Sequence, residues 1–155
     1  MNWSIAQLAY FAGILDGEGC FYISRITRQN QVTHRSPEYL AKLYVVSTDK
    51  ELINWLSEIF EGYTFERKGG KSHWRRKYEW GASAKTAIEI TKAVFPYLVI
   101  KQEHAGVFLR FQETVGHDRT KGRVAKLSDE ILSIREWCYQ EIKRLNSRNL
   151  PVSSF

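Results

Sequence analysis

Two pairs of strand-like segments, separated by one helical pattern, constrain the fold of this chain most strongly. Residues 20–28 and 39–47 form the first pair, and residues 63–68 and 74–83 form the second; most are rich in β-branched and aromatic residues. In 39–47 and 74–83 apolar and polar residues alternate, which is typical of a strand that buries only one face. Polar intervals connect the two segments of each pair. We therefore expect two hairpins that belong to one antiparallel sheet.

Helical patterns lie before, between and after these hairpins. Ser4 is a suitable N-cap for the first helix, Thr48-Asp49-Lys50-Glu51 matches a capping box for the second, and Pro96 ends the third. The element order is α-β-β-α-β-β-α-α-α, which predicts an α+β layer fold with helices packed on the sheet. The predicted helices cover 4–17, 48–62, 85–96, 99–115 and 128–148.

Length and composition fit a single domain that spans residues 1–155. Apolar residues make up 43% of the chain and only 3 residues are proline, which excludes a disordered or collagen-like chain. The 2 cysteines, Cys20 and Cys138, are too few for a disulfide framework or a cysteine-rich zinc site. The sequence has no signal-peptide pattern and no apolar stretch of membrane-spanning length, so we expect a soluble intracellular protein without a membrane partner. Without zinc-ligand spacing, the histidines are interpreted as DNA-contacting or surface residues: His34, His73, His104 and His117.

The positive charge is concentrated on the predicted sheet. The net charge is +6, and many basic residues gather in 20–46 and 66–79, on or between the strands. This distribution favours a polyanionic partner over two solvated basic faces. A twisted antiparallel ribbon fits the major groove of duplex DNA, although exposed tyrosine and arginine are also typical of single-stranded RNA binding. The residues expected to contact nucleic acid are Tyr22, Ser24, Arg25, Arg28, Lys42, Tyr44, Arg67, Lys68, Arg75, Lys77 and Glu79. The face of Arg25 is left open, because Ile26 breaks the alternation of its strand.

The first helix ends on two acids, Asp16 and Glu18, within the sequence LAYFAGILDGEGCF of residues 8–21. The helix dipole already concentrates negative charge at this end, so two carboxylates there call for a compensating positive charge. A solvated helix end would meet this requirement with water alone. Beside a basic, phosphate-binding sheet, a divalent cation such as Mg²⁺ meets it better, because Mg²⁺ takes carboxylate and phosphate oxygens as ligands.

A stripe of small residues runs along the same helix. Ala9, Gly13 and Gly17 lie one turn apart and leave a face on which another backbone can approach closely. We expect two copies of the chain to pack through this stripe, which would bring Glu18 of both copies to one place. Two clustered carboxylates repel each other unless they share a proton or bind a cation.

The nine residues Phe11-Ala12-Gly13-Ile14-Leu15-Asp16-Gly17-Glu18-Gly19 resemble the signature of the LAGLIDADG homing endonucleases. The likeness extends to the order of elements, because residues 4–115 are similar to the α-β-β-α-β-β-α core of that family. Residues 127–149 resemble the closing helix of some members with a single motif. The resemblance implies a saddle-shaped antiparallel sheet backed by helices, with an additional helix at the C-terminal end.

The resemblance also implies roles for individual residues. The metal ligand of the family corresponds to Glu18, with the carbonyl of Gly17 as a further ligand, whereas Asp16 has a positional role. The basic residue near the attacking water corresponds to Lys101, which the sequence alone describes equally well as a solvated surface lysine. Many members have a glutamine at the end of the second strand, where this chain has Ser47 and then Thr48. A hydroxyl group there can still order water.

Three functions are compatible with these features. The one favoured is a Mg²⁺-dependent, homodimeric DNA endonuclease of the intron-homing kind, because a single motif implies a homodimer and a partly palindromic target of about two duplex turns. Catalysis is then assigned to Glu18, Lys101 and Ser47. The second is an RNA maturase that acts on its own intron, which the departure at Ser47 favours. The third is a DNA-binding repressor without nuclease activity.

Overall fold

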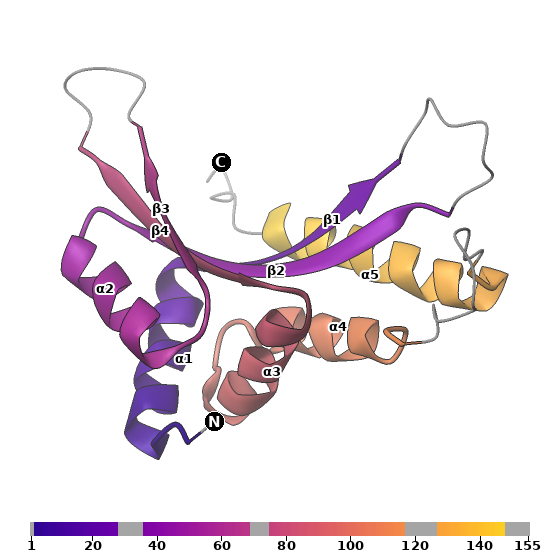
Figure 1. The fold of residues 1–155 in the computed structure, drawn as a ribbon. Helices are drawn as coiled ribbons and strands as arrows, with labels where there is room; N and C mark the ends of the chain where they lie inside the picture. The colour runs from indigo at the N-terminus through magenta and orange to yellow at the C-terminus, as the bar shows by residue number, and fades with distance from the viewer. Residues whose placement is uncertain (1, 28–35, 69–74, 117–126, 148–155) are drawn as a thin grey trace, which may run out of the picture.

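The computed structural model describes residues 2–27, 36–68, 75–116 and 127–147. They form one four-stranded antiparallel sheet with the strand order β1-β2-β4-β3. The bounds are β1 (Gly19–Ile26), β2 (Glu38–Ser47), β3 (Tyr63–Arg67) and β4 (Lys77–Ser83). The sheet curves upward at both ends into a saddle (Figure 1). The predicted α+β class and the two hairpins of one sheet are confirmed.

The helices all lie on one side of the sheet and leave its other face open (Figure 1). We call the uncovered side the open face. The helices are α1 (Ile5–Glu18), α2 (Lys50–Ile59), α3 (Ala84–Val94), α4 (Gln102–Gln112) and α5 (Asp129–Ser147), with a 3₁₀ turn η1 (Phe95–Tyr97) after α3. No helix in the described residues has the length and apolar character needed to cross a membrane.

The core lies between the sheet and the helices, and aromatic side chains dominate it. Trp80 of β4 is fully buried, and its indole N–H donates to the carbonyl of Phe60 at 3.3 Å. The ring of Phe11 on α1 lies 4.3 Å from that of Phe60 and 5.2 Å from that of Trp80, measured between centroids. Large aromatic side chains contribute strongly to burial, so this contact fixes α1 against the sheet.

The observed N-caps of α1 and α2 agree with the sequence predictions except at one residue. Ser4 caps α1 as expected, and its capping box is completed by Gln7. The cap of α2 is Asp49 rather than Thr48, because the Asp49 carboxylate accepts the N–H groups of Glu51 and Leu52. An aspartate at the N-terminus also interacts favourably with the helix dipole.

The last two helices depart from the predicted pattern at specific points. Residues 99–101 form a turn and α4 begins only at Gln102, so the expected helix over 99–115 starts too early. In α5 the buried side includes a charged residue, Arg135, beside Cys138, Ile142 and Leu145. Its guanidinium group donates to the hydroxyl of Thr114 at 3.0 Å and to the Thr114 carbonyl at 2.9 Å. Arg135 thereby ties α5 to the chain that leaves α4.

Candidate functional site

The Asp16 carboxylate is not free for ligand binding. Its two oxygens accept the backbone N–H groups of Val99, Ile100 and Lys101 at 2.8, 3.1 and 2.9 Å. These are the amides of the turn that starts α4, so a residue near the end of α1 caps the beginning of another helix. The structure thus places Asp16 in a positional role within the chain.

The Lys101 side chain in turn contacts the end of α1. Its ammonium group donates to the carbonyl of Leu15 at 2.8 Å and to the carbonyl of Gly19, and the residue is only 7% exposed. Burial lowers the pKa of Lys101 from its ordinary value, and Cys20 and Asp16 oppose that shift. The positive charge required at the acidic end of α1 is therefore a buried lysine. The interpretation of Lys101 as a solvated surface lysine is therefore wrong.

Glu18 is left with an uncommitted carboxylate. It is the last residue of α1, it is exposed, and it makes no hydrogen bond or ion pair within the described part of the chain. Gly17 precedes it in the last turn of the helix, where backbone carbonyl groups lack intrahelical partners. Carboxylate and carbonyl oxygens are the ligands that Mg²⁺ and Ca²⁺ prefer, so this helix end fits a hard divalent cation. Within the described ranges no group of three or more His, Cys, Asp and Glu side chains could hold a metal ion.

The outer face of α1 forms an open groove that leads to Glu18. The groove has a volume of about 430 Å³ and an apolar lining. No described atom lies within 4 Å of the place that a Cβ would take at Gly13 or Gly17, so packing within the chain does not explain these glycines. Two large apolar side chains of the same helix, Ile5 and Tyr10, are 71% and 57% exposed. The lining residues are Ala9, Tyr10, Gly13, Ile14, Gly17, Glu18 and Leu52.

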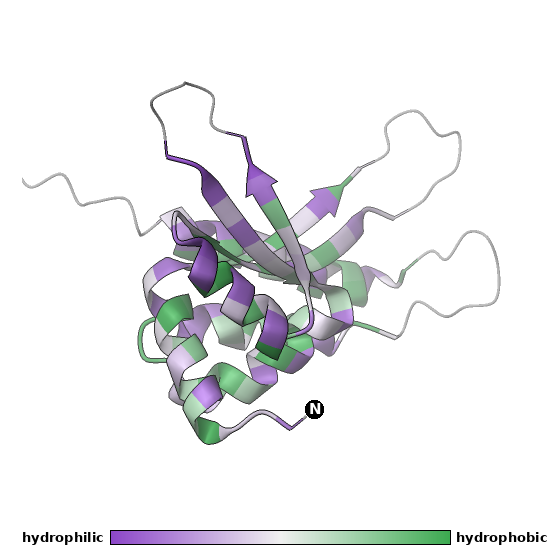
Figure 2. Ribbon diagram, turned by 60° about the vertical axis from the view of Figure 1, so that its left-hand side comes forward, coloured by the Kyte–Doolittle hydropathy of each residue, from purple (hydrophilic) through white to green (hydrophobic). Residues whose placement is uncertain are grey.

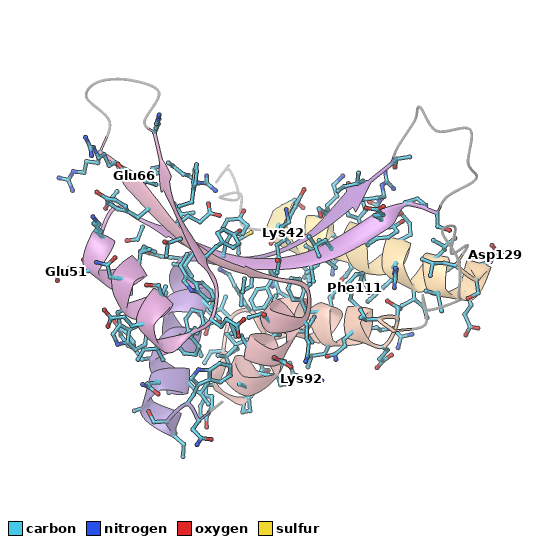
Figure 3. The ribbon with its side chains drawn as sticks, in the orientation of Figure 1. Lys42, Glu51, Glu66, Lys92, Phe111 and Asp129 are labelled. Atoms are coloured by element: carbon cyan, nitrogen blue, oxygen red, sulfur yellow. The ribbon has the colours of Figure 1, made fainter. Side chains whose placement is uncertain are left out.

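The open face of the sheet mixes cations with tyrosines and apolar side chains. The register pairs Tyr22 with Lys42 and Cys20 with Tyr44, which puts these residues on the same face. Lys42 lies near the middle of the sheet, on β2 (Figure 3). Residues of alternate parity, among them Phe21, Ala41, Leu43 and Trp80, are buried on the helix side. The open face is formed by Cys20, Tyr22, Ser24, Ile26, Glu38, Leu40, Lys42, Tyr44, Val46, Tyr63, Phe65, Arg67, Lys77, Glu79, Gly81 and Ser83.

The β3–β4 end of this face contains a preorganised ion pair. Arg67 donates through Nε and Nη2 to one carboxylate oxygen of Glu79 at 2.8 and 2.6 Å. The Tyr63 hydroxyl donates to the other oxygen at 3.4 Å, and the Tyr63 ring lies over Gly81, where a Cβ would approach it to 2.5 Å. The far ends of β3 and β4 are hydrophilic (Figure 2). Lys68 and Arg75 are exposed just beyond these strands.

The sequence has no match among protein-family models or curated proteins. The structure does have matches among solved structures. The homing endonuclease I-CvuI in complex with its DNA target superposes with a TM-score of 0.72 at 16% identity, over 90% of this chain and 82% of that one. The homing endonuclease I-TnaI gives 0.55 and 20%, over 96% and 99%. The LAGLIDADG homing endonuclease I-LtrWI, bound to its target DNA, gives 0.61 and 18%, over 91% and 45%.

This chain has the LAGLIDADG homing-endonuclease fold. The match with I-TnaI covers nearly all of both chains, whereas the match with I-LtrWI covers less than half of that protein. The signature found in the sequence corresponds to the second half of α1, where Asp16 contacts the backbone of Lys101 and Glu18 ends the helix.

One of the predicted DNA-contacting arginines, Arg25, does not lie on the open face of this LAGLIDADG fold. Arg25 turns to the helix side, where it donates to Glu136 of α5 at 2.7 Å and lies 4.7 Å from the ring centre of Tyr139. Burial favours a raised pKa for Glu136, but hydrogen bonds from Tyr39, Gln140 and Arg25 outweigh it and lower that pKa. The same contacts raise the pKa of Arg25. Arg28 lies outside the described residues.

Ser47 is the last residue of β2, in register with Tyr78 on the helix side. Its hydroxyl accepts the N–H of Asp49 at 3.0 Å, next to the start of α2. The open-face residue at this end of β2 is Val46, which has no polar side-chain atom. The structure therefore does not bring the Ser47 hydroxyl to the open face.

His104 is buried, so its interpretation as a surface or DNA-contacting residue is wrong. Neither ring nitrogen has a hydrogen-bond partner within the described residues, and the ring centre lies 6.2 Å from that of Phe21. Burial lowers the pKa of His104, and the nearby Lys101 ammonium adds to this effect. The other three histidines lie outside the described residues. Sequence analysis also missed Tyr63 and Phe65 on the open face, although both alternate with Arg67 on the same short strand.

Proposed function

We propose that this chain is a site-specific DNA endonuclease that acts as a homodimer and depends on a divalent metal ion. The observation that carries the proposal is the combination at the end of α1. Asp16 and Lys101 are both committed to fixing this helix end, while Glu18, the last residue of the helix, keeps a carboxylate that makes no contact within the described residues. A structural helix end has no need of such a carboxylate.

The homodimer is supported by the outer face of α1. Its glycines leave room that no described side chain fills, and its apolar residues stay exposed. Two α1 helices that pack along Ala9, Gly13 and Gly17 would bury this surface and set the Glu18 carboxylates of the two copies close together. The coverage of the solved neighbours agrees, because this chain matches less than half of I-LtrWI and a second copy would supply the remainder.

The DNA partner is supported by the open face. Lys42, Lys77 and Arg67 provide cations for phosphate and base contacts, and a two-stranded ribbon fits the major groove. Both I-CvuI and I-LtrWI are bound to DNA in their structures. A twofold dimer of such sheets reads two half-sites, so the target is expected to be a long duplex with partial palindromic symmetry.

In this mechanism Glu18 and the Gly17 carbonyl would hold the metal ion, which is Mg²⁺ in the proposed reaction. When bound, the ion activates water and stabilises negative charge on the scissile phosphate. The residues of the chain hold the end of α1 in place and position the duplex. Lys101 anchors the end of α1 that presents Glu18, and its ammonium group keeps a positive charge close to the site. The sheet fixes the duplex so that a phosphate lies beside each helix end.

Cleavage with matched variants tests the proposal. Supercoiled plasmids that contain the joined sequences flanking the gene, or a randomised insert, are incubated with the protein in Mg²⁺, Ca²⁺ or chelator. We expect linear product in Mg²⁺ from the native chain, no cleavage by Glu18→Gln, and equal DNA binding by both proteins. Glu61→Gln, an exposed acid away from the motif, is the control and retains activity. Glu18→Gln cleavage at the native rate would refute the metal site.

A DNA-binding protein without nuclease activity is the second candidate. It is favoured by Ser47, whose hydroxyl is engaged on the helix side, and by Val46, which offers no group to order water on the open face. In the same assay this candidate predicts specific binding without a strand break in Mg²⁺. Splicing assistance that persists in Glu18→Gln would instead identify an RNA maturase.

A further inference from the structure

The β1–β2 end of the open face presents an apolar patch, which we define as Tyr22, Ile26 and Leu40. Ser24 pairs with Leu40 across the two strands, and Tyr22 and Ile26 flank Ser24 at two-residue spacing. The three side chains therefore stand on one face, and Leu40 is a diagonal neighbour of both Tyr22 and Ile26. Tyr22 is 40% exposed and Ile26 is 50% exposed, and no helix covers this face (Figure 1).

Among the described residues, few cations lie near this patch. Lys42 lies at its inner edge, opposite Tyr22, Glu38 lies opposite Ile26, and Arg25 of the same strand is turned under the sheet to Glu136. At the β3–β4 end Arg67 and Lys77 accompany the fixed Glu79 carboxylate, beside the exposed side chains of Tyr63 and Phe65. The patch is therefore poorer in described cations than the other end of the face.

We propose that the apolar patch reads thymine, with Ile26 contacting the C5 methyl group of one thymine in each half-site. This inference rests on the proposed function, because it assumes that the open face lies in the major groove. Base edges in that groove carry hydrogen-bonding groups, and the thymine methyl is the apolar group among them. The exposed Ile26 side chain, with Leu40 as its diagonal neighbour, complements this methyl group, and Lys42, farther along the same face, can contact a phosphate.

The size of the effect follows from the methyl group alone. Burial of one methylene-sized group contributes about 0.8 kcal/mol, which corresponds to roughly fourfold in affinity. Two half-sites read by a homodimer give about fifteenfold for the whole target, if both thymines lose the methyl group.

Deoxyuridine substitution tests this reading. Duplexes bound by the full chain in Ca²⁺ are selected from a randomised 30-base-pair library, and each thymine of the consensus is then replaced by deoxyuridine, which lacks only the methyl group. We expect one thymine position per half-site at which the replacement weakens binding by about fourfold. Ile26→Ser should bind both duplexes equally at that position. Phe65→Ser removes apolar surface from the other end of the same face and should keep the thymine preference there.

Three results would overturn the inference. The native chain could bind thymine and deoxyuridine duplexes equally at every position, or Ile26→Ser could retain the preference. Alternatively, Ile26→Ser could abolish self-association without changing the base preference, which would assign the patch to a contact between copies. Failure of the native chain to select any duplex would refute the proposed function as well, and is thereby distinguishable from these outcomes.

Discussion

Asp16 and Lys101 each hold the end of the other's helix. The Asp16 carboxylate accepts the N–H groups of residues 99–101, which lead into α4, and the Lys101 ammonium group donates to the carbonyl of Leu15 in the last turn of α1. Both contacts compensate a helix dipole, and together they lock the two ends at the place where Glu18 emerges. The two helix ends are therefore fixed, whereas the Glu18 carboxylate is free to bind a ligand.

This reciprocal capping predicts that the two residues are energetically coupled. Asp16→Asn removes charge from three hydrogen bonds, and Lys101→Met removes the charged donor from the carbonyl groups of Leu15 and Gly19, so each should lower the free energy of unfolding by about 2–3 kcal/mol. The double variant should lose clearly less than the sum of both, because each variant already loosens the other contact. Urea denaturation measures all four proteins. Lys85→Met, which removes an exposed lysine, should stay within about 0.5 kcal/mol of the native chain.

The alternation of the strands was a sufficient basis for predicting the sheet. Tyr78, Trp80 and Ala82 turn toward the helices while Lys77 and Glu79 turn outward, as period-two alternation requires. The helix dipole likewise indicated that a positive charge must lie at the end of α1. The identity of that charge was not predictable, because Lys101 is 86 positions from Leu15 in the sequence and only the packing of α4 brings them together.

Contacts over a long sequence separation also explain the other differences. Arg25 has the parity of Phe21 and Ile23 and therefore lies on the helix side, and its partner there, Glu136 on α5, is 111 positions later, which no local pattern predicts. The same holds for the candidate site. The motif predicted Glu18 and the small residues of α1, whereas the burial of His104 and the turn of the Ser47 hydroxyl toward Asp49 depend on tertiary packing.

His104 makes the fold sensitive to mild acid. Its folded-state pKa is lowered, so the unfolded chain binds a proton first as the pH falls below the ordinary histidine pKa of about 6.5. The contribution of the neutral His104 ring to the free energy of unfolding is fully present above about pH 6.5. It is lost as the pH falls toward the folded-state pKa. His104→Leu should flatten this dependence and raise stability, since an apolar group replaces two unpaired nitrogens. Thermal unfolding from pH 8 to pH 5 measures the difference, and an unchanged slope would contradict it.

Lys77 should contribute to DNA binding through counterion release. It is an exposed lysine on the open face, opposite Arg67. Lys77→Ala should weaken binding to all duplexes to a similar extent and reduce the slope of log affinity against log salt by about 1 for each protomer that contacts the DNA. Fluorescence anisotropy over a range of salt concentrations gives the slope. Lys85→Ala, on α3 at the helix side, should leave the slope unchanged.

A substitution at Gly13 should change the stability of the monomer and that of the dimer in opposite directions. Its Cβ position is open in the described structure, so Gly13→Ala meets no obstacle within the chain and should stabilise α1 by up to about 1 kcal/mol through helix propensity. The added methyl group would nevertheless separate two α1 helices that pack through their glycines, and the dimer should dissociate at least tenfold more readily. Gly106→Ala provides the matched control, because Gly106 also lies in a helix with an open Cβ position but on α4. Denaturation at protein concentrations at which the chains are monomeric should show both variants as stable as or more stable than the native chain, whereas sedimentation should show weakened association for Gly13→Ala alone. Equal association of the two variants would exclude the glycine stripe as the dimer contact.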